Sequence, residues 1–328
     1  TSFFREQFSD GQIPPYIWAE KVGSGQIQQT VPLAETAYEL AVMTDDEELL
    51  RETYHAWSKW DAWMMQYRDS SKRNVCEAFC EYDTGHDNSG RFHQISKRCP
   101  GDDAKICPPE SGMPRIAPDL TATLYGGRVA MAKIAAALGM AKEQEYWQEI
   151  AFETRKALIE YCYDTETEFF YDRDCNGNLV KVIGDAGIRV LMEHVPDQQM
   201  FEAIFSRWII NPQAFWTMLP LPSVAASDST FVHPPRENCW GGPCQALLAL
   251  RAPRWLEHYG KYSALDYMMH RYLEAFEEAQ EFCQQFDPLT GQITPGTGEY
   301  SPAMCCVVDF ISRIEGILQT LDGISWGC

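Results

Sequence analysis

Apolar residues recur along most of the chain with the 3.6-residue spacing of amphipathic α-helices. A run of acidic residues at 45–48 marks the start of one helix, because carboxylates are favoured at a helix N-terminus, and Gly139 marks the end of another. The helices predicted by this spacing cover residues 31–43, 46–66, 119–138, 142–163, 185–194, 197–208, 243–251, 261–283 and 302–320.

The segments between these helices are polar and long, above all residues 67–117 and 209–242, which hold many of the prolines and glycines. Loops of such length in a compact domain are usually functional. Only residues 168–183, EFFYDRDCNGNLVKVI, resemble a strand pair, with a turn at Asn176 and Gly177. Their spacing is also similar to a calcium loop, but Ile183 occupies the position of the bidentate glutamate, which favours a plain turn.

Repeated helix pairs with long connecting loops predict an all-α fold, an α/α toroid whose loops build a cleft at one end. The pattern supplies nine or ten helices, fewer than the twelve of an (α/α)6 toroid. We therefore expect an N-terminal hairpin to lie outside this chain, and we expect residues 1–328 to form a single catalytic domain.

Charge narrows the range of ligands. The 328 residues include 27 basic and 47 acidic side chains, a net charge of −20 that would repel nucleic acids and anionic membranes. The longest apolar runs are too short for a membrane span, and no signal peptide opens the chain, although its start at Thr1 leaves a processed leader open. A small neutral or cationic ligand fits this balance, and localisation is not fixed by it.

The twelve cysteines are compatible with disulfides or with free thiols. The adjacent pair Cys305 and Cys306 lies in an apolar run, and no glycosylation sequon occurs, which favours thiols and a cytoplasmic setting. Four others surround a polar motif without the Cys-x-x-Cys spacing of zinc sites: Cys76, Cys80, Cys99 and Cys107. We expect neither a metal nor a cofactor.

That polar motif is YDTGHDNSGRF, residues 82–92. Asp83 and Asp87 are close enough in sequence to affect each other's protonation, and a carboxyl group held protonated can act as a general acid. The same residues also suit an Asx-rich turn capped by its own side chains. Composition alone does not separate the two interpretations.

The motif resembles the E-S-G-x-D-x-S-x-R block of trehalases and of glycoside hydrolase family 63, in which the aspartate is the general acid and corresponds to Asp87 here. Further blocks follow in the same order as in that family. FSDGQIPPYIW resembles DGxIPxY, APDLTATLYGG resembles DLNAxLY, NCWGGP resembles W-x-G-P, and FDPLTG followed by YSPAMCCVVDF resembles the closing region. The resemblance extends from residue 8 to about residue 310.

This resemblance implies a six-hairpin glycosidase that inverts an α-linked glucosyl or mannosyl saccharide. Such enzymes use two carboxyl groups, one to protonate the leaving oxygen and one to activate water. Asp87 takes the first role. In the second position, where the family has Glu in an E-x-(Y/F)-(D/N) block, the chain has Gln284, whose neutral amide cannot accept a proton.

Three explanations for Gln284 in the place of a glutamate remain open: a substitute base elsewhere in the chain, an altered mechanism, or a carbohydrate-binding protein without catalysis. Glu299, in a glycine-flanked loop, is the preferred substitute, and Glu281 and Asp287 are weaker candidates. The alternative for Glu299 is a solvated loop carboxylate. A sugar epimerase or isomerase is a third class, disfavoured because the seven histidines form no obvious pair.

Several side chains are candidates for contact with the saccharide, each with a plainer alternative. Arg91 is expected to contact substrate or Asp83, and Asp119 to accept a sugar hydroxyl or cap its helix. Aromatic faces suit the apolar side of a pyranose ring, but they also pack in cores. His86 and His93 are expected to form hydrogen bonds without a metal. The predicted substrate-binding residues are Tyr16, Trp18, Asp83, Arg91, Asp119, Trp240 and Gln284.

Overall fold

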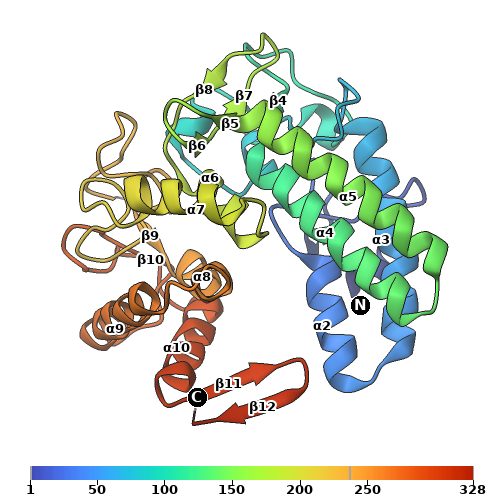
Figure 1. Cartoon of the computed structure of the whole chain (residues 1–328). Helices are drawn as coiled ribbons and strands as arrows, with labels where there is room; N and C mark the ends of the chain where they lie inside the picture. The colour runs from blue at the N-terminus through green and yellow to red at the C-terminus, as the bar shows by residue number, and fades with distance from the viewer. Residues whose placement is uncertain (1, 236–237, 328) are drawn as a thin grey trace. The chain divides into compact units, whose positions relative to one another are not determined.

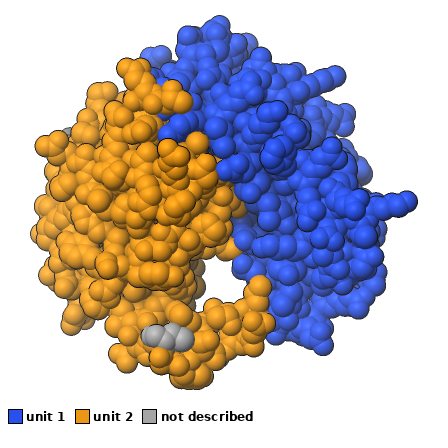
Figure 2. All heavy atoms as spheres, viewed as in Figure 1, with its two compact units in different colours: residues 1–85, 94–164, 170–181 blue, residues 86–93, 165–169, 182–328 orange. Residues whose placement is uncertain are grey.

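The computed structural model describes residues 2–235 and 238–327, and the chain divides into two compact units. Unit 1 comprises residues 1–85, 94–164 and 170–181, and unit 2 comprises residues 86–93, 165–169 and 182–328 (Figure 2). Helices dominate both units, as predicted. None of the helices in the described part of the chain combines the length and the hydrophobicity that a membrane span requires.

Unit 1 is built on two helix pairs, α2 with α3 and α4 with α5, and on a small four-stranded sheet in the order β3-β4-β7-β8 (Figure 1). Its helices are α1 (Ser2–Arg5), α2 (Leu33–Thr44), α3 (Glu47–Tyr67), α4 (Pro118–Ala137) and α5 (Ala141–Cys162). Its strands are β1 (Ile17–Trp18), β2 (Lys21–Val22), β3 (Glu77–Ala78), β4 (Arg115–Ile116), β5 (Tyr163–Asp164), β7 (Asp172–Arg173) and β8 (Leu179–Val180). The short strand β6 (Phe169–Phe170) spans the division between the units.

The predicted boundaries of the first helices are confirmed. The side chain of Asp46 caps α3 by accepting a hydrogen bond from the Leu49 N–H at 2.9 Å, and α4 ends before Gly139, whose φ is +73°. Within unit 1, α3 buries a tryptophan-rich face. Gly127 of α4 permits close packing there, because a Cβ at this position would lie 2.1 Å from the Trp57 ring.

The predicted hairpin at 168–183 is also found. Asp172 pairs with Val180 and Arg173 with Leu179, and Gly177 turns the chain with a φ of +87°. The Asp174 carboxylate accepts the N–H groups of Asn176 and Asn178, so the acidic side chain stabilises the turn itself. The other two-residue strands were not predicted, because they are too short to show a readable alternation.

Unit 2 contains α6 (Asp185–Met192), α7 (Gln198–Ile204), α8 (Ala246–His258), α9 (Tyr262–Ala279) and α10 (Ser301–Ile314) (Figure 1). Its strand pairs are β9 (Cys244–Gln245) with β10 (Gln285–Phe286), and β11 (Ile317–Thr320) with β12 (Gly323–Trp326). Single helical turns occur at Gly90–Phe92 and Phe205–Ile209.

Three predicted helix ends in unit 2 are wrong. Helix α9 ends at Ala279 rather than at residue 283, because Gln280 adopts a φ of +54°. Helix α8 continues past residue 251 to His258, through Pro253, because Trp255 and Leu256 beyond the proline are fully buried. The last helix ends at Ile314 rather than at 320: Gly316 has a φ of +69°, and the hairpin β11–β12 follows.

Candidate functional site

The general-acid candidate Asp87 lies in unit 2, in the segment His86–His93. The Asp87 side chain is half-buried, and its backbone carbonyl accepts a hydrogen bond from the Trp240 N–H at 2.9 Å. Asn88 follows with a φ of +58°, and the Ser89 side chain caps the short turn Gly90–Phe92. The motif is thus a tight turn held against the segment that contains Trp240.

Asn238 connects Asp87 to Gln284. Its Nδ2 donates to Asp87 Oδ2 at 3.5 Å, and its Oδ1 accepts from Gln284 Nε2 at 3.0 Å. Its backbone carbonyl accepts from Asn88 Nδ2 at 2.8 Å. The structure therefore brings Asp87 and Gln284 to either side of the Asn238 amide.

Two buried glutamines hold this arrangement. Gln245 on β9 and Gln285 on β10 face each other in the strand pair, and both are fully buried. Gln285 Oε1 accepts from the Cys239 N–H at 3.0 Å, and Gln245 Nε2 donates to the Cys239 carbonyl at 2.9 Å. Because both amides bind the backbone of Cys239, the preceding residue Asn238 is presented on a rigid support.

A buried chain of charged groups lies behind the motif. Arg91 Nη1 lies 2.7 Å from His86 Nδ1. His86 Nε2 contacts Asp185 Oδ1, and Asp185 Oδ2 lies 3.0 Å from Arg189 Nε. Arginine can only donate, so Nδ1 of His86 is the acceptor and its proton is on Nε2, which donates to Asp185. Burial and the nearby Arg189 lower the pKa of His86, which favours this neutral form.

Replacing His86 by glutamine should remove an acid-sensitive contribution to stability. The pKa of His86 is lower in the folded chain, so the unfolded chain binds the proton more readily. The contribution is present above about pH 6.5 and falls by about 1 kcal/mol per pH unit below it. We expect urea unfolding at about pH 7.5 and 5.5 to show a larger loss for the wild type than for His86→Gln. Equal losses in the two proteins would contradict the neutral assignment.

Arg91 and Trp240 both pack in the buried layer formed around His86, Asp185 and Arg189. Arg91 is 5% exposed and contacts His86, while its predicted contact with Asp83 stays a prediction. Trp240 is buried, with His86 at its edge and the Arg189 guanidinium 5.0 Å from its ring centroid. These contacts favour packing for Trp240 and a supporting role for Arg91, while contact of either with a saccharide stays a prediction.

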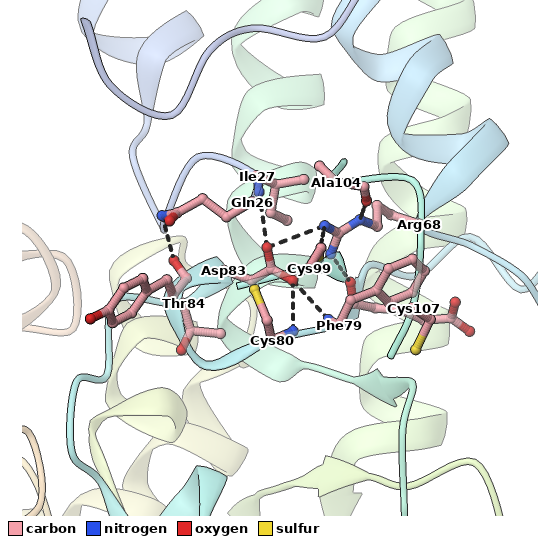
Figure 3. A network of polar contacts seen from close by, with 12 residues as sticks. Gln26, Ile27, Arg68, Phe79, Cys80, Asp83, Thr84, Cys99, Ala104 and Cys107 are labelled. Atoms are coloured by element: carbon pink, nitrogen blue, oxygen red, sulfur yellow. Dashed lines mark hydrogen bonds and ion pairs between the residues drawn. The ribbon is translucent and has the colours of Figure 1, made fainter. Parts of the chain in front are cut away.

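Asp83 belongs to unit 1 and is fully buried, and Figure 3 shows its polar contacts. Arg68 Nη1 lies 2.5 Å from its Oδ2, and the N–H groups of Ile27, Phe79 and Cys80 donate to its two oxygens. This pairing raises the pKa of Arg68 despite the opposing effect of burial. The predicted contact of Asp83 with substrate does not fit, because its acceptor positions are used inside the protein.

The thiols of Cys80 and Cys99 lie beside this ion pair, and with Asp83 they form a cluster of potential metal ligands in unit 1 (Figure 3). Arg68 Nη2 is 3.7 Å from the Cys99 sulfur. A permanent guanidinium charge at this distance opposes a bound cation, and the carboxylate is already fully hydrogen-bonded. The cluster therefore suits a buried structural ion pair better than a metal centre.

The other candidates of unit 1 differ in exposure. Trp18 is 65% exposed and packs against Tyr16, with 4.9 Å between ring centroids, and the Tyr16 hydroxyl accepts from Arg98 at 2.8 Å. Asp119 is fully buried in the first turn of α4, where its carboxylate accepts the Leu120 N–H at 3.0 Å. Trp18 offers an open aromatic face beside the half-buried Tyr16, while Asp119 stabilises a helix start.

The candidate bases lie near β10 in unit 2. Glu299 is exposed, with a φ of +56°, in a loop where the Thr297 carbonyl accepts the Gln284 N–H at 2.6 Å. The Glu281 carboxylate lies against Gly298 of the same loop. Asp287 instead pairs with His233 at 2.9 Å and accepts the Leu289 N–H, so it holds the turn after β10.

Sequence reasoning missed Asn238, Asp185 and Arg68. Asn238 stands directly before the C-W-G-G-P segment, a weak signal that could have been used. Asp185 lies at the start of α6 and Arg68 directly after α3, and no local pattern joins either residue to the motif. Only the folded chain brings each one to its partner.

Comparison with known proteins gives a family and a fold. The sequence matches the model of the mannosylglycerate hydrolase MGH1-like glycoside hydrolase domain over residues 1–302. None of the curated protein sequences compared with the chain matches it. The structure is similar to that of GH63 mannosylglycerate hydrolase from Thermus thermophilus in complex with glucose, with a TM-score of 0.76, 19% identity, and 95% of this chain and 86% of that chain covered.

Two further solved structures agree. The Thermus thermophilus enzyme in complex with Tris and D-glycerate has a TM-score of 0.74 and 17% identity over 93% of this chain and 86% of that chain. Neutral trehalase from Saccharomyces cerevisiae has a TM-score of 0.63 and 14% identity over 87% of this chain and 62% of that chain. At these identities the likeness shows the fold, which is the predicted six-hairpin glycosidase type.

Proposed function

This chain belongs to the mannosylglycerate hydrolase MGH1-like glycoside hydrolase family, and we propose that it hydrolyses an α-linked glucosyl or mannosyl saccharide with inversion. The observation that carries the proposal is the arrangement of Asp87 and Gln284 on either side of Asn238. These are the two positions at which the resembled family has its acid and its base. Two carboxyl groups about 6.5 to 9.5 Å apart characterise inverting glycosidases.

Asp87 is the general acid in this proposal. Its side chain is half-buried on a turn fixed by the Trp240 N–H and by the layer of His86 and Arg91. A carboxyl group held in a fixed position within reach of the leaving oxygen can donate its proton with little loss of conformational entropy. Glu299 is the proposed base, supported by the contact between its loop and the Gln284 backbone.

The proposal is tested by proton NMR of the purified chain with α-glucosides, α-mannosides and trehalose. Release of the β-anomer first from an α-linked substrate is the expected result. First release of the α-anomer would overturn inversion, and binding without turnover across the panel would favour the second candidate below.

That second candidate is a carbohydrate-binding protein without hydrolysis, and Gln284 is the observation that favours it. Its Nε2 donates to Asn238, so the side chain behaves as an amide that binds rather than as a base. The exposed Trp18, which packs against the half-buried Tyr16, could serve a binding protein as well as an enzyme.

Two substitutions distinguish an enzyme that uses Glu299 as a substitute base from a protein that has lost its base and its catalytic activity. If Glu299 is the base, Glu299→Gln should lower kcat by roughly 10² to 10⁴-fold, the usual loss for a missing base. Gln284→Glu should then change the rate little. If catalysis has been lost, Gln284→Glu should create hydrolysis in an otherwise inactive protein.

Glu281→Gln is the matched control, since Glu281 contacts the same loop at Gly298. Turnover by this variant should equal that of the wild type. A loss in Glu281→Gln with none in Glu299→Gln would move the base assignment to Glu281.

A further inference from the structure

The side chain of Asn238 forms hydrogen bonds to both Asp87 and Gln284. Its own backbone is held at its carbonyl group and at the residue that follows. The carbonyl accepts from Asn88, and the backbone of the next residue is bound by Gln245 and Gln285. The side chain therefore projects from a rigid segment toward both groups.

The chemistry of the three groups fixes their orientation. Asn238 presents its Nδ2 to Asp87 Oδ2, an oxygen that can accept whether or not the other carboxyl oxygen carries a proton. Its Oδ1 then faces Gln284, which must use its Nε2. The oxygen of the Gln284 amide, Oε1, is an acceptor and can bind an O–H donor such as water or a sugar hydroxyl.

We propose that Asn238 is a positioning residue, which holds the Asp87 carboxyl and the Gln284 amide in a fixed mutual arrangement. The inference rests on the proposed function for its catalytic meaning, but the coupling itself belongs to the protein without substrate. In the enzyme, Asn238 keeps Asp87 directed at the leaving oxygen and leaves Gln284 to bind a hydroxyl or water that another group deprotonates.

The test is a titration of the Asp87 carboxyl carbon by ¹³C NMR in the full chain labelled at aspartate, with the resonance identified by its loss in Asp87→Asn. Asn238→Asp keeps the shape but replaces the donor with a second carboxylate. Loss of a donor and gain of a like charge both disfavour the ionised form. The Asp87 pKa should rise by about one unit or more.

Asn211→Asp is the matched control, because it adds the same charge to unit 2 and keeps the acceptor that binds the Gln213 N–H. It should leave the Asp87 titration unchanged. If Asn238→Asp does not fold, Asn238→Ser removes the long donor and should also raise the Asp87 pKa. An Asp87 titration identical to that of the wild type in a folded Asn238 variant overturns the proposal.

Activity separates this inference from the proposed function. With a substrate in hand, Asn238→Asp should move the alkaline limb of the kcat/KM profile to higher pH, because the acid must be protonated to act. A shifted Asp87 titration in a protein that hydrolyses nothing would support the coupling and contradict the hydrolase. Hydrolysis together with an unshifted Asp87 titration would support the hydrolase and contradict the coupling through Asn238.

Discussion

Asp87→Asn is expected to abolish glycoside hydrolysis while the chain stays folded. The amide cannot donate an acidic proton to the leaving oxygen, and losing a general acid costs roughly 10² to 10⁴-fold in rate. The backbone contact between Asp87 and Trp240 and the hydrogen-bonding shape of the side chain are retained. Release of reducing sugar, with urea unfolding measured in parallel, checks both parts.

Asp197→Asn is the control for the lost charge. Asp197 caps α7 in the same unit by accepting the Met200 N–H, and asparagine caps a helix equally well. Turnover and stability should both be preserved in this variant. Unchanged turnover in Asp87→Asn would remove Asp87 from the mechanism.

Breaking the Arg68–Asp83 pair should have the opposite effect, a large loss of stability. Arg68→Met leaves the fully buried Asp83 carboxylate without its counter-charge, and removing one partner of a buried pair costs about 3 to 5 kcal/mol. The urea midpoint of the transition that unfolds unit 1 should fall accordingly.

Arg51→Met is the matched control, because Arg51 pairs with Glu47 on the exposed surface of α3 in the same unit. Exposed pairs contribute about 0 to 1 kcal/mol. A loss for Arg68→Met no larger than that of Arg51→Met would show that the buried pair is not a stabilising element. We thus expect Asp83 to contribute mainly to stability and Asp87 mainly to catalysis.

Local sequence predicted most helices because their signals are local. The cap at Asp46, the end before Gly139 and the turn at Gly177 each depend on residues within a few positions. The failures came from tertiary packing. Pro253 lies inside α8 because the apolar residues after it are buried, and residues 317–326 pair as a hairpin that the apolar pattern did not distinguish from helix.

The same distinction applies to the site. The order of motifs along the sequence predicted the family, and the resemblance pointed to Asp87 as the acid candidate, to Gln284 in place of the family's glutamate and to Glu299 as a candidate substitute base. The residues of this polar turn did not reveal by themselves that Asp83 forms a buried ion pair while Asp87 remains a candidate acid, because both aspartates stand in the same turn. The structure gives Asp83 to Arg68 and places Asp87 beside Asn238.

Periodicity, motif order and composition were sufficient to predict the helical fold, the family and the acidic, polar character of the candidate site. The folded chain was needed to show which charges neutralise each other and which amides meet. Those partners come from distant parts of the chain, Arg68 from the end of α3 and Asn238 from the loop before β9. A hydrogen bond to such a partner requires a distance of about 3 Å, which sequence spacing does not specify.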